Sequence, residues 1–333
     1  MNRTCYRVFV LIVLVATTLI ARAARAQDPL PSWNDTAAKK AIVDFVAKVT
    51  KEGSPDFVKP EDRIATFDND GTMWVEQPIY TQVEFAMQRV PAAVKEHPEL
   101  ADNEVFKAIL SRDREAIAKF TLGDIEKIVA VTHSGMTVEQ FKQIVKDWLD
   151  RAEQPRFKKP YTQCIYQPML ELMQYLRASG FKTYIVTGGG QDFVRAFAQK
   201  TYGVPGDQVI GTAGKVKYQY KDGKAELIKL PEVLLIDDKT GKPEGINLVI
   251  GQRPIAAFGN STGDQQMLEY TGAGSGARLM MLVHHDDAVR EYAYGQDSKI
   301  GTFSNALMDE AKSKGWTVIS MKDDWKTIFP WEK

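Results

Sequence analysis

Apolar residues in this chain fall into two patterns, one with helical spacing and one in short continuous runs. The short runs end at Phe67 or lie within "TYIVTGGG", "PIAAFGNS" and "RLMMLVHH". Continuous apolar runs of this kind are typical of parallel strands that are buried on both faces. Helix-forming sequence follows the later runs, so strands alternate with helices along the chain. This alternation predicts an α/β fold with a parallel sheet that helices cover on both faces.

The middle of the chain, from Pro78 to Pro160, shows helical spacing and no convincing strand pattern. A capping box, Thr137 to Gln140, precedes an apolar stripe of the kind that one face of a helix presents. The stripe consists of Val138, Phe141, Ile144, Val145, Trp148 and Leu149. Further helices are predicted near Tyr80–Val94, Asn103–Leu110 and Gly123–Val131. We therefore expect a helical segment inserted into the α/β core.

The segment from Gly206 to Asp237 contains "KYQYKDGKAEL", in which the residue character alternates with a period of two. Asp222-Gly223 is a preferred turn sequence of two-residue β-hairpins. We predict an antiparallel hairpin here. Tyr218 and Tyr220 beside lysines could also indicate a nucleic-acid surface, but the hairpin explains the alternation more simply.

The N-terminal residues have the features of a signal peptide. Arg3 and Arg7 precede an uncharged and mostly apolar run, Val8–Ala21, and Ala24–Ala26 offers a cleavage site. This run is shorter than the roughly 20 residues that a membrane-spanning helix requires. We expect residues 1–26 to be removed on export, which leads to the periplasm if the cell is Gram-negative. A retained N-terminal anchor is the alternative.

Composition narrows the range of partners. The 43 basic and 43 acidic residues give a formal net charge of zero. Such a chain has no global field that attracts nucleic acid or an anionic membrane, so an anionic ligand must be bound by local charges. Without the signal peptide, Cys164 is the one cysteine in the sequence. Export therefore does not imply an internal disulfide framework.

Two aspartates, Asp68 and Asp70, come directly after the first apolar run, in "FDNDGT". Ligands of open α/β sheets bind beyond the carboxyl ends of the strands. Two close carboxylates raise each other's pKa unless a cation neutralises them, and magnesium prefers hard oxygen ligands. Asp264, after "PIAAFGNS", could complete the cluster. A turn with Asx caps explains the Asp-x-Asp spacing by itself, but it does not explain the motifs downstream.

These residue types suit phosphoryl transfer. A carboxylate beside a cation can attack phosphorus, and a second one can protonate the leaving oxygen and deprotonate the attacking water. Thr187 and the glycines from Gly188 to Gly190 offer a hydroxyl and bare amides for a phosphate oxygen. A glycine-rich turn without a ligand has the same sequence. Lys242, which precedes Pro243, could offset the charge of the transition state.

The order of these motifs resembles the haloacid dehalogenase superfamily of phosphotransferases and phosphatases, over nearly the whole mature chain. The motifs are Asp-x-Asp-Gly-Thr, a strand that ends in Thr, a Lys before a short helix, and Gly-x-x-x-x-Asp after a later strand. "GGGQDFVR" and "GNSTGDQQML" favour the phosphoserine-phosphatase-like branch. The resemblance implies these roles: Asp68 as nucleophile, Asp70 as general acid/base, Thr187, Gly188 and Lys242 as phosphate ligands, and Asp68, Asp70 and Asp264 as Mg²⁺ ligands.

The resemblance also implies the substrate class and the domain organisation. Members that remove halogens usually lack an acid at the position of Asp70, so Asp70 favours phosphate esters. The stretch from Asp68 to Thr187 is too long for one crossover helix, and an inserted helical cap fits it. We predict a signal peptide at 1–26, a Rossmann-like three-layer α/β/α core at 27–77 and 164–333, and a helical cap at 78–163.

The sequence departs from the family pattern in two ways. Asn260 stands where that branch usually has an aspartate that binds the metal or one of its waters, so we expect weaker magnesium affinity. The cap offers no clear counterpart of the charged pair that reads the head group of phosphoserine. Glu76 with Arg89 or Arg112 is possible, although ordinary exposed charges explain these residues more simply.

The sequence therefore predicts an exported, magnesium-dependent hydrolase of a small phosphate monoester. We expect no nucleic-acid partner and no membrane span after processing. Two alternatives remain open: a phosphotransferase that uses the same aspartyl phosphate, and an exported binding protein with weak catalysis. His284 and His285 could approach the same edge of the sheet and bind zinc, but a polar end to a strand explains them as well.

Overall fold

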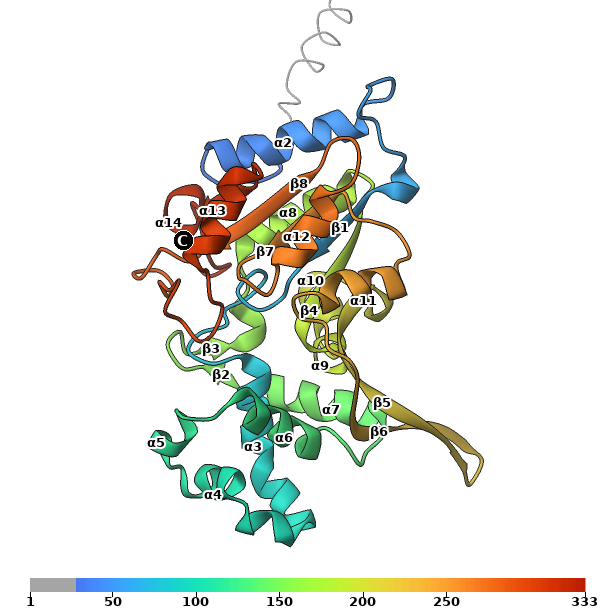
Figure 1. Ribbon diagram of the computed structural model, residues 1–333, viewed down its shortest axis with the longest axis vertical. Helices are drawn as coiled ribbons and strands as arrows, with labels where there is room; N and C mark the ends of the chain where they lie inside the picture. Colours follow the sequence, from blue (N-terminus) through green and yellow to red (C-terminus); the bar gives the residue numbers. More distant parts are fainter. Residues whose placement is uncertain (1–27, 333) are drawn as a thin grey trace, which may run out of the picture.

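The computed structural model describes residues 28–332, and the predicted signal peptide lies outside these residues. Its centre is a seven-stranded sheet with the order β6-β5-β4-β1-β7-β8-β9 (Figure 1). These strands are β1 (Ile64–Phe67), β4 (Lys182–Gly190), β5 (Val209–Lys221), β6 (Lys224–Leu235), β7 (Ala256–Gly259), β8 (Leu279–His284) and β9 (Thr317–Ser320). β6 runs antiparallel to β5, and the other neighbours pair in parallel. The predicted parallel sheet is thus confirmed, with one antiparallel edge strand.

Helices cover both faces of this sheet. Successive residues of β7 point to opposite faces, so that Phe258 and Ala257 belong to different apolar clusters. The first cluster includes side chains of α2 and α8, and the second includes side chains of α11, α12 and α13. These helices are α2 (Ala37–Thr50), α8 (Gln167–Ala178), α11 (Gly241–Val249), α12 (Gln265–Gly272) and α13 (Asn305–Ser313). The core is therefore a three-layer α/β/α sandwich of the Rossmann-like kind, as predicted.

A helical segment separates β1 from β4 in the sequence and lies at the far end of the molecule in Figure 1. It contains α3 (Thr81–Glu96), α4 (Glu104–Ser111), α5 (Arg114–Ile117), α6 (Leu122–Thr132) and α7 (Val138–Leu149). The predicted capping box before α7 is formed, with both reciprocal hydrogen bonds. α3, α4 and α6 share a small apolar cluster of their own, whereas Phe141 and Val145 of α7 pack into the main core. The bounds 78–163 for a separate cap stay a prediction.

Short elements complete the described chain. They are the two-stranded sheet of β2 (Glu153–Gln154) and β3 (Lys159–Pro160), and the helices α9 (Gln191–Arg195), α10 (Ala198–Tyr202) and α14 (Met321–Asp324). Turns of 3₁₀-helix occur at Pro60–Asp62, Pro98–Asp102, Tyr161–Gln163 and Gly206–Gln208. Across residues 28–332, none of the helices combines the length and apolar character needed to span a bilayer.

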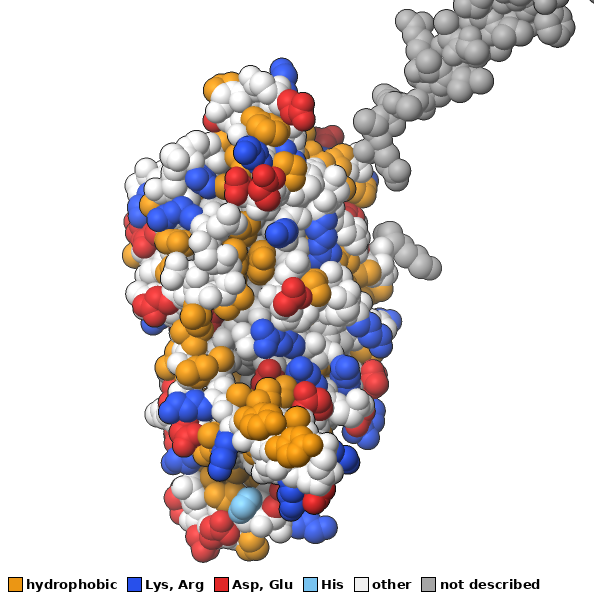
Figure 2. All heavy atoms as spheres, turned by 90° about the vertical axis from the view of Figure 1, so that its right-hand side faces the viewer, with side chains coloured by type: hydrophobic (Ala, Val, Ile, Leu, Met, Phe, Trp, Pro, Cys, Tyr) orange, Lys and Arg blue, Asp and Glu red, His pale blue; other side chains and the backbone are white. Residues whose placement is uncertain are grey.

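The predicted hairpin is present as β5 and β6, and it projects from the core in Figure 1. Asp222 and Gly223 have φ values of 52° and 76°, as a two-residue hairpin turn with two left-handed positions requires. Figure 2 faces this hairpin and shows apolar side chains grouped on the lower part of that face. Exposed apolar residues of the hairpin include Val216, Tyr218, Tyr220 and Leu227.

Candidate active site

The loop that follows β1 turns sharply and packs against the end of β7. The Asp68 amide donates to the Phe258 carbonyl at 2.9 Å, and the Gly71 amide donates to the Trp74 carbonyl at 2.8 Å. Gly71 has a φ of 74°, which glycine adopts without strain. A Cβ atom there would lie 2.0 Å from Asn260 Nδ2. The local fold therefore requires glycine after the second aspartate.

Asp264 has both carboxylate oxygens engaged by protein donors. Its Oδ2 accepts hydrogen bonds from the Asn260 amide at 2.9 Å and from the Ser261 amide at 3.0 Å. Its Oδ1 accepts from Lys242 Nζ at 2.5 Å. A Cβ atom on Gly259 would lie 2.4 Å from Asp264 Cβ, so the backbone of β7 approaches this side chain closely. Asp264 thus fixes the turn after β7 and orients the lysine.

Lys242, in the first turn of α11, joins the ends of β1, β4 and β7, and its side chain is 2% exposed. Its ammonium donates to Asp68 Oδ1 and Asp264 Oδ1, each at 2.5 Å, and to the Val186 carbonyl at 3.0 Å. All three ammonium hydrogens are therefore used. Burial by itself lowers the pKa of Lys242, but the Asp264 and Asp68 carboxylates raise it above its ordinary value. The lysine remains positively charged.

The Asp68 carboxyl is buried, and one of its oxygens remains free. Burial raises its pKa well above the ordinary range, Asp264 raises it further, and Lys242 partly lowers it. Lys242 holds Oδ1, while Oδ2 has no hydrogen-bond partner within residues 28–332. The free oxygen is available to attack an electrophile, and a nearby cation would favour its ionised form.

Asp70 is more open to solvent than Asp68. Its Oδ1 accepts a hydrogen bond from Trp74 Nε1 at 2.8 Å. Its Oδ2 faces the glycine-rich end of β4, Gly188–Gly190 (the glycine loop), because a Cβ atom on Gly189 would lie 3.6 Å from Oδ2 and 3.2 Å from Thr187 Oγ1. Burial raises the pKa of Asp70, and the bond from Trp74 partly lowers it. A carboxyl with a raised pKa beside an open loop is suited to exchange protons.

The glycine loop makes hydrogen bonds to Thr187 and to the helical segment. The Gly189 amide donates to Thr187 Oγ1 at 3.0 Å, and the Gly190 amide donates to Gln82 Oε1 at 2.6 Å. Thr187 is buried and Gly188 is exposed. Gln82 belongs to α3, so the helical segment touches the loop directly. No local sequence pattern predicts this contact, because it depends on how α3 packs.

The predicted magnesium ligands are only partly gathered. Among the described residues, no three carboxylate, imidazole or thiol side chains lie close enough together to hold one metal ion. Asp68 and Asp70 lie on one loop, whereas Asp264 is turned toward Lys242. Asn260 Oδ1, which accepts a hydrogen bond from Thr72 at 3.2 Å, adjoins this loop. The carboxylates of Asp68 and Asp70 and the amide oxygen of Asn260 are hard oxygen donors, which is the ligand type that magnesium prefers.

Glu76 is a member of the site that was expected to be an exposed charge. The structure corrects this expectation, because its side chain is 2% exposed and Oε1 accepts from Asn260 Nδ2 at 2.7 Å. Burial raises the pKa of Glu76 well above its ordinary value, and Asp70 and Asp68 raise it further. Neither arginine that was suggested as a partner of Glu76 binds it. Arg89 donates to the Thr132 carbonyl, and Arg112 is exposed.

Asp237 is another buried carboxyl that the sequence did not reveal. It is fully buried between the end of β6 and α11, and neither oxygen has a hydrogen-bond partner in the described structure. Burial raises its pKa to about 7, although the positive charge of Lys242 partly lowers it. Its place beside Lys242 makes it part of the electrostatic surroundings of the site.

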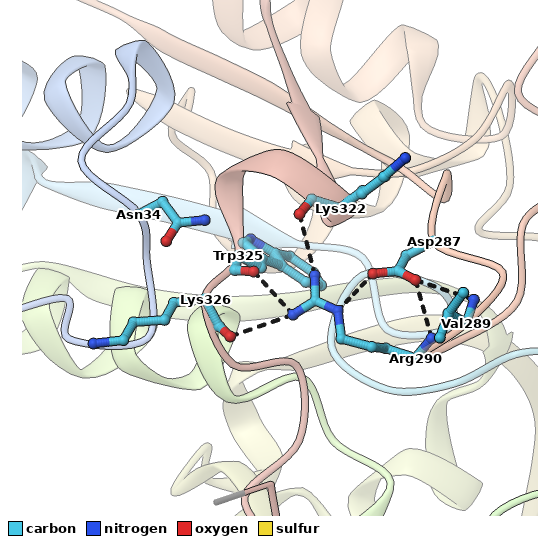
Figure 3. Close-up of a pocket in the computed structure, with 7 residues that line it drawn as sticks. All are labelled: Asn34, Asp287, Val289, Arg290, Lys322, Trp325 and Lys326. Atoms are coloured by element: carbon cyan, nitrogen blue, oxygen red, sulfur yellow. Dashed lines mark hydrogen bonds and ion pairs between the residues drawn. The ribbon is translucent and has the colours of Figure 1, made fainter.

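A cavity of about 440 Å³ lies elsewhere, and none of the strand-end residues lines it (Figure 3). Arg290 crosses its wall and is bound by protein acceptors on every side. It donates to Asp287 Oδ2 at 2.5 Å and to the carbonyls of Met321, Lys322 and Trp325. With its donors already satisfied, this arginine ties the C-terminal segment together.

Comparison with known proteins places these motifs in a family. The model of the haloacid dehalogenase-like hydrolase family matches residues 65–269. This range includes Asp68, Thr187, Lys242 and Asp264 in the order described above. No match was found among curated proteins.

Solved structures add evidence on the fold. A protein of unknown function from Anaerococcus prevotii DSM 20548 is 16% identical, with a TM-score of 0.52 over 87% of this chain and 94% of that chain. A protein of unknown function from Bordetella pertussis Tohama I is 14% identical, with a TM-score of 0.48 over 77% and 97%. A phosphoserine phosphohydrolase-like protein from Francisella tularensis subsp. tularensis SCHU S4 is 18% identical, with a TM-score of 0.36 over 66% and 87%. The first of these supports the shared fold.

Proposed function

The chain belongs to the haloacid dehalogenase-like hydrolase family, and on this premise we propose that it is a magnesium-dependent phosphomonoesterase. It acts on a small organic phosphate through an aspartyl phosphate on Asp68. The observation that carries the proposal is the position of Asp68. One of its oxygens is fixed by Lys242, and the other, at the end of β1, has no hydrogen-bond partner among residues 28–332.

In the first step, Asp68 Oδ2 attacks the phosphorus atom while the bond from phosphorus to the ester oxygen breaks. Asp70 gives its proton to the leaving oxygen, so the alcohol departs neutral. The raised pKa of Asp70 supports this assignment, because the proton is retained closer to neutral pH. Lys242 keeps Asp68 in place and offsets part of the negative charge that gathers at the site.

In the second step, Asp70 accepts a proton from a water molecule whose oxygen attacks the phosphorus atom. The bond between phosphorus and Asp68 breaks, inorganic phosphate leaves, and the Asp68 carboxylate is restored. Thr187 and the amide of Gly188 are proposed to hold the phosphoryl oxygens during both steps. Thr187 Oγ1 and Asp70 Oδ2 both lie close to Gly189, which supports this role.

Magnesium would be held by Asp68 and Asp70, with Asn260 contributing an amide oxygen. Asp264 was expected to be a third carboxylate ligand, but its hydrogen bonds favour a role in orienting Lys242. When bound, the ion supplies positive charge that screens the phosphate from the carboxylates. The amide in place of a carboxylate leads us to propose a modest magnesium affinity.

The location and the substrate are also proposals. The sequence features of residues 1–26 support export, with the periplasm as destination in a Gram-negative cell. The contact of Gln82 with the glycine loop supports substrate selection by the helical segment, because α3 lies against the segment that is proposed to bind the phosphate. A small phosphate ester is the proposed partner.

Hydrolysis of p-nitrophenyl phosphate by the purified mature chain tests the function. Wild type, Asp68→Asn and Asp297→Asn are compared with magnesium and with EDTA. Asp297 belongs to none of the motifs and serves as the matched control. We expect activity that requires magnesium, persists in Asp297→Asn and disappears in Asp68→Asn, because an amide is a poor nucleophile toward phosphorus.

Two results would direct attention to the alternatives. Inactivity of wild type toward this ester and a broad panel of phosphoesters, at saturating magnesium, would contradict the phosphatase assignment. Formation of a phosphate ester from added glycerol would instead identify a phosphotransferase. Both measurements use the same protein preparation.

A further inference from the structure

Glu76 and Asn260 form a buried pair at the edge of the site. Asn260 Nδ2 donates to Glu76 Oε1 at 2.7 Å, and the hydroxyl of Tyr294 donates to the same oxygen at 2.7 Å. Asn260 is 1% exposed and Glu76 is 2% exposed. A buried carboxylate is costly unless it has hydrogen-bond donors, and here both donors meet one of its oxygens.

Three chain segments fix this pair in place. A Cβ atom on Gly71 would lie 2.4 Å from Glu76 Oε1, and one on Gly301 would lie 1.7 Å from it. His285 Nε2 donates to the Gly71 carbonyl at 2.8 Å, which ties the loop after β1 to the segment after β8. Glu76 therefore cannot move without displacing the loop that carries Asp68 and Asp70.

Acidic side chains outnumber basic side chains around this pair. The aspartate loop borders Glu76, because a Cβ atom on Gly71, the residue after Asp70, would lie 2.4 Å from Glu76 Oε1. In the described part of the chain, Glu76 forms no ion pair, and Lys242 is committed to Asp68 and Asp264. One protein cation therefore faces several carboxylates in a poorly hydrated region. Such an arrangement favours a bound cation.

We propose that Glu76 and Asn260 act as one unit of the cation site. With a cation bound, Glu76 is ionised and supplies the negative charge that Asn260 lacks, and it holds the amide by Nδ2 so that Oδ1 faces Thr72 on the aspartate loop. Glu76 is thus a positioning residue that acts through Asn260. This inference rests on the proposed function, because it concerns the magnesium that the function uses.

The two positions are coupled by their chemistry. An aspartate at 260 would place a carboxylate oxygen against Glu76 Oε1, where Nδ2 now lies at 2.7 Å. Two carboxylates in contact repel each other strongly. A carboxylate at position 76 therefore requires an amide at position 260. The double variant Glu76→Gln, Asn260→Asp exchanges the carboxylate and the amide, so it keeps both the total charge and the hydrogen bond between the two side chains.

A double-mutant cycle tests this coupling. Wild type, Glu76→Gln, Asn260→Asp and the double variant are compared by calorimetric titration with Mg²⁺ and by thermal melting with and without Mg²⁺. Glu76→Gln keeps the size of the side chain and a carbonyl oxygen that can accept from Asn260 and Tyr294, so it removes the charge alone. We expect it to weaken Mg²⁺ binding by about 10-fold to 100-fold.

The other variants give the remaining sides of the cycle. Asn260→Asp should melt earlier than wild type in EDTA, because it adds a second carboxylate to the pair. The double variant should recover the magnesium affinity of wild type. Glu171→Gln is the matched control: Glu171 is buried and accepts from Ser32, away from the site, so the variant should leave the affinity unchanged.

The outcomes separate this inference from the proposed function. Unchanged Mg²⁺ affinity in Glu76→Gln, failure of the double variant to recover affinity, or absence of Mg²⁺ binding by wild type would each overturn the pairing. If the cycle behaves as expected but wild type hydrolyses no phosphoester, the pairing stands and the phosphatase assignment fails. Folding of each variant is checked by circular dichroism and by its melting transition.

Discussion

The sheet edge formed by the ends of β1, β4 and β7 is held together differently from the helical segment α3–α6. At the sheet edge, buried charged groups bind one another, with Lys242 between Asp68 and Asp264 at 2.5 Å each. In the helical segment, apolar side chains of α3, α4 and α6 share a small cluster. Gln82 makes a hydrogen bond from this segment to the glycine loop.

The two regions therefore differ in how well they tolerate substitution. Buried charges with fixed partners tolerate little substitution, since removing one partner leaves the others uncompensated. An apolar cluster of similar volume can be repacked at a smaller cost. We therefore expect catalysis at the sheet edge and substrate selection by residues of the helical segment.

The largest expected effect is the loss of Lys242. Replacing Lys242 by Met should lower the free energy of unfolding by about 3–5 kcal/mol, because the carboxylates of Asp68 and Asp264 would remain buried without the positive charge between them. Urea denaturation in EDTA measures the change. Lys40→Met removes an exposed ion pair with Asp44 and should change stability by about 1 kcal/mol or less. Equal losses in both variants would contradict the account of the sheet edge.

A smaller effect is expected from Asp237. Its folded-state pKa is raised to about 7 from 3.8, so the neutral form stabilises the fold. This stability is present below the unfolded pKa and is lost as the pH rises through the folded pKa. Asn at this position cannot ionise. The free energy of unfolding of Asp237→Asn, measured relative to that of wild type, should rise by roughly 3 kcal/mol between about pH 5 and about pH 8.

Denaturation of both proteins by urea at several pH values measures this difference. Asp35→Asn, which removes an exposed ion-pair partner of Lys39, serves as the control and should show no comparable change over the same range. A constant difference between wild type and Asp237→Asn would show that the carboxyl ionises in the fold as it does in water.

The smallest effect concerns the contact between the two regions. Gln82→Ala removes the acceptor of the Gly190 amide, which should cost about 1 kcal/mol, or roughly fivefold in kcat/KM. Gln143→Ala is the control, since Gln143 bonds to Asp147 on the exposed face of α7. Steady-state kinetics with p-nitrophenyl phosphate measure both. Equal kcat/KM in wild type and Gln82→Ala would show that the helical segment does not order the loop.

The sequence was most informative where a signal is local. The apolar runs predicted β1, β4, β7 and β8, and the capping box predicted the start of α7 at Val138. Glu76 could not be recognised in this way, because its burial depends on Tyr294 and Gly301, which are far away in the sequence. The antiparallel pairing of β5 and β6 was predicted from the local turn sequence, whereas the place of β5 beside β4 is set by tertiary packing.

Some residues of the site could be predicted from the local sequence, whereas others are brought together only by tertiary packing. The spacing of Asp68 and Asp70 after an apolar run suffices to place both on one loop. The partners of Asp264 could not be read from spacing, since Lys242 and Asp264 meet only when α11 packs beside β7. Asp237 was hidden because a carboxylate in a charged turn normally faces water.

The central claim is that Asp68 becomes phosphorylated during turnover. The most direct test is to quench the wild-type reaction with acid and treat the protein with borohydride, which reduces an acyl phosphate to an alcohol. Peptide mass spectrometry then identifies the modified residue. The account predicts conversion of Asp68 to homoserine in wild type with magnesium and substrate, and none in EDTA. Continued ester hydrolysis without any modified Asp68, or hydrolysis that survives Asp68→Asn, would contradict it.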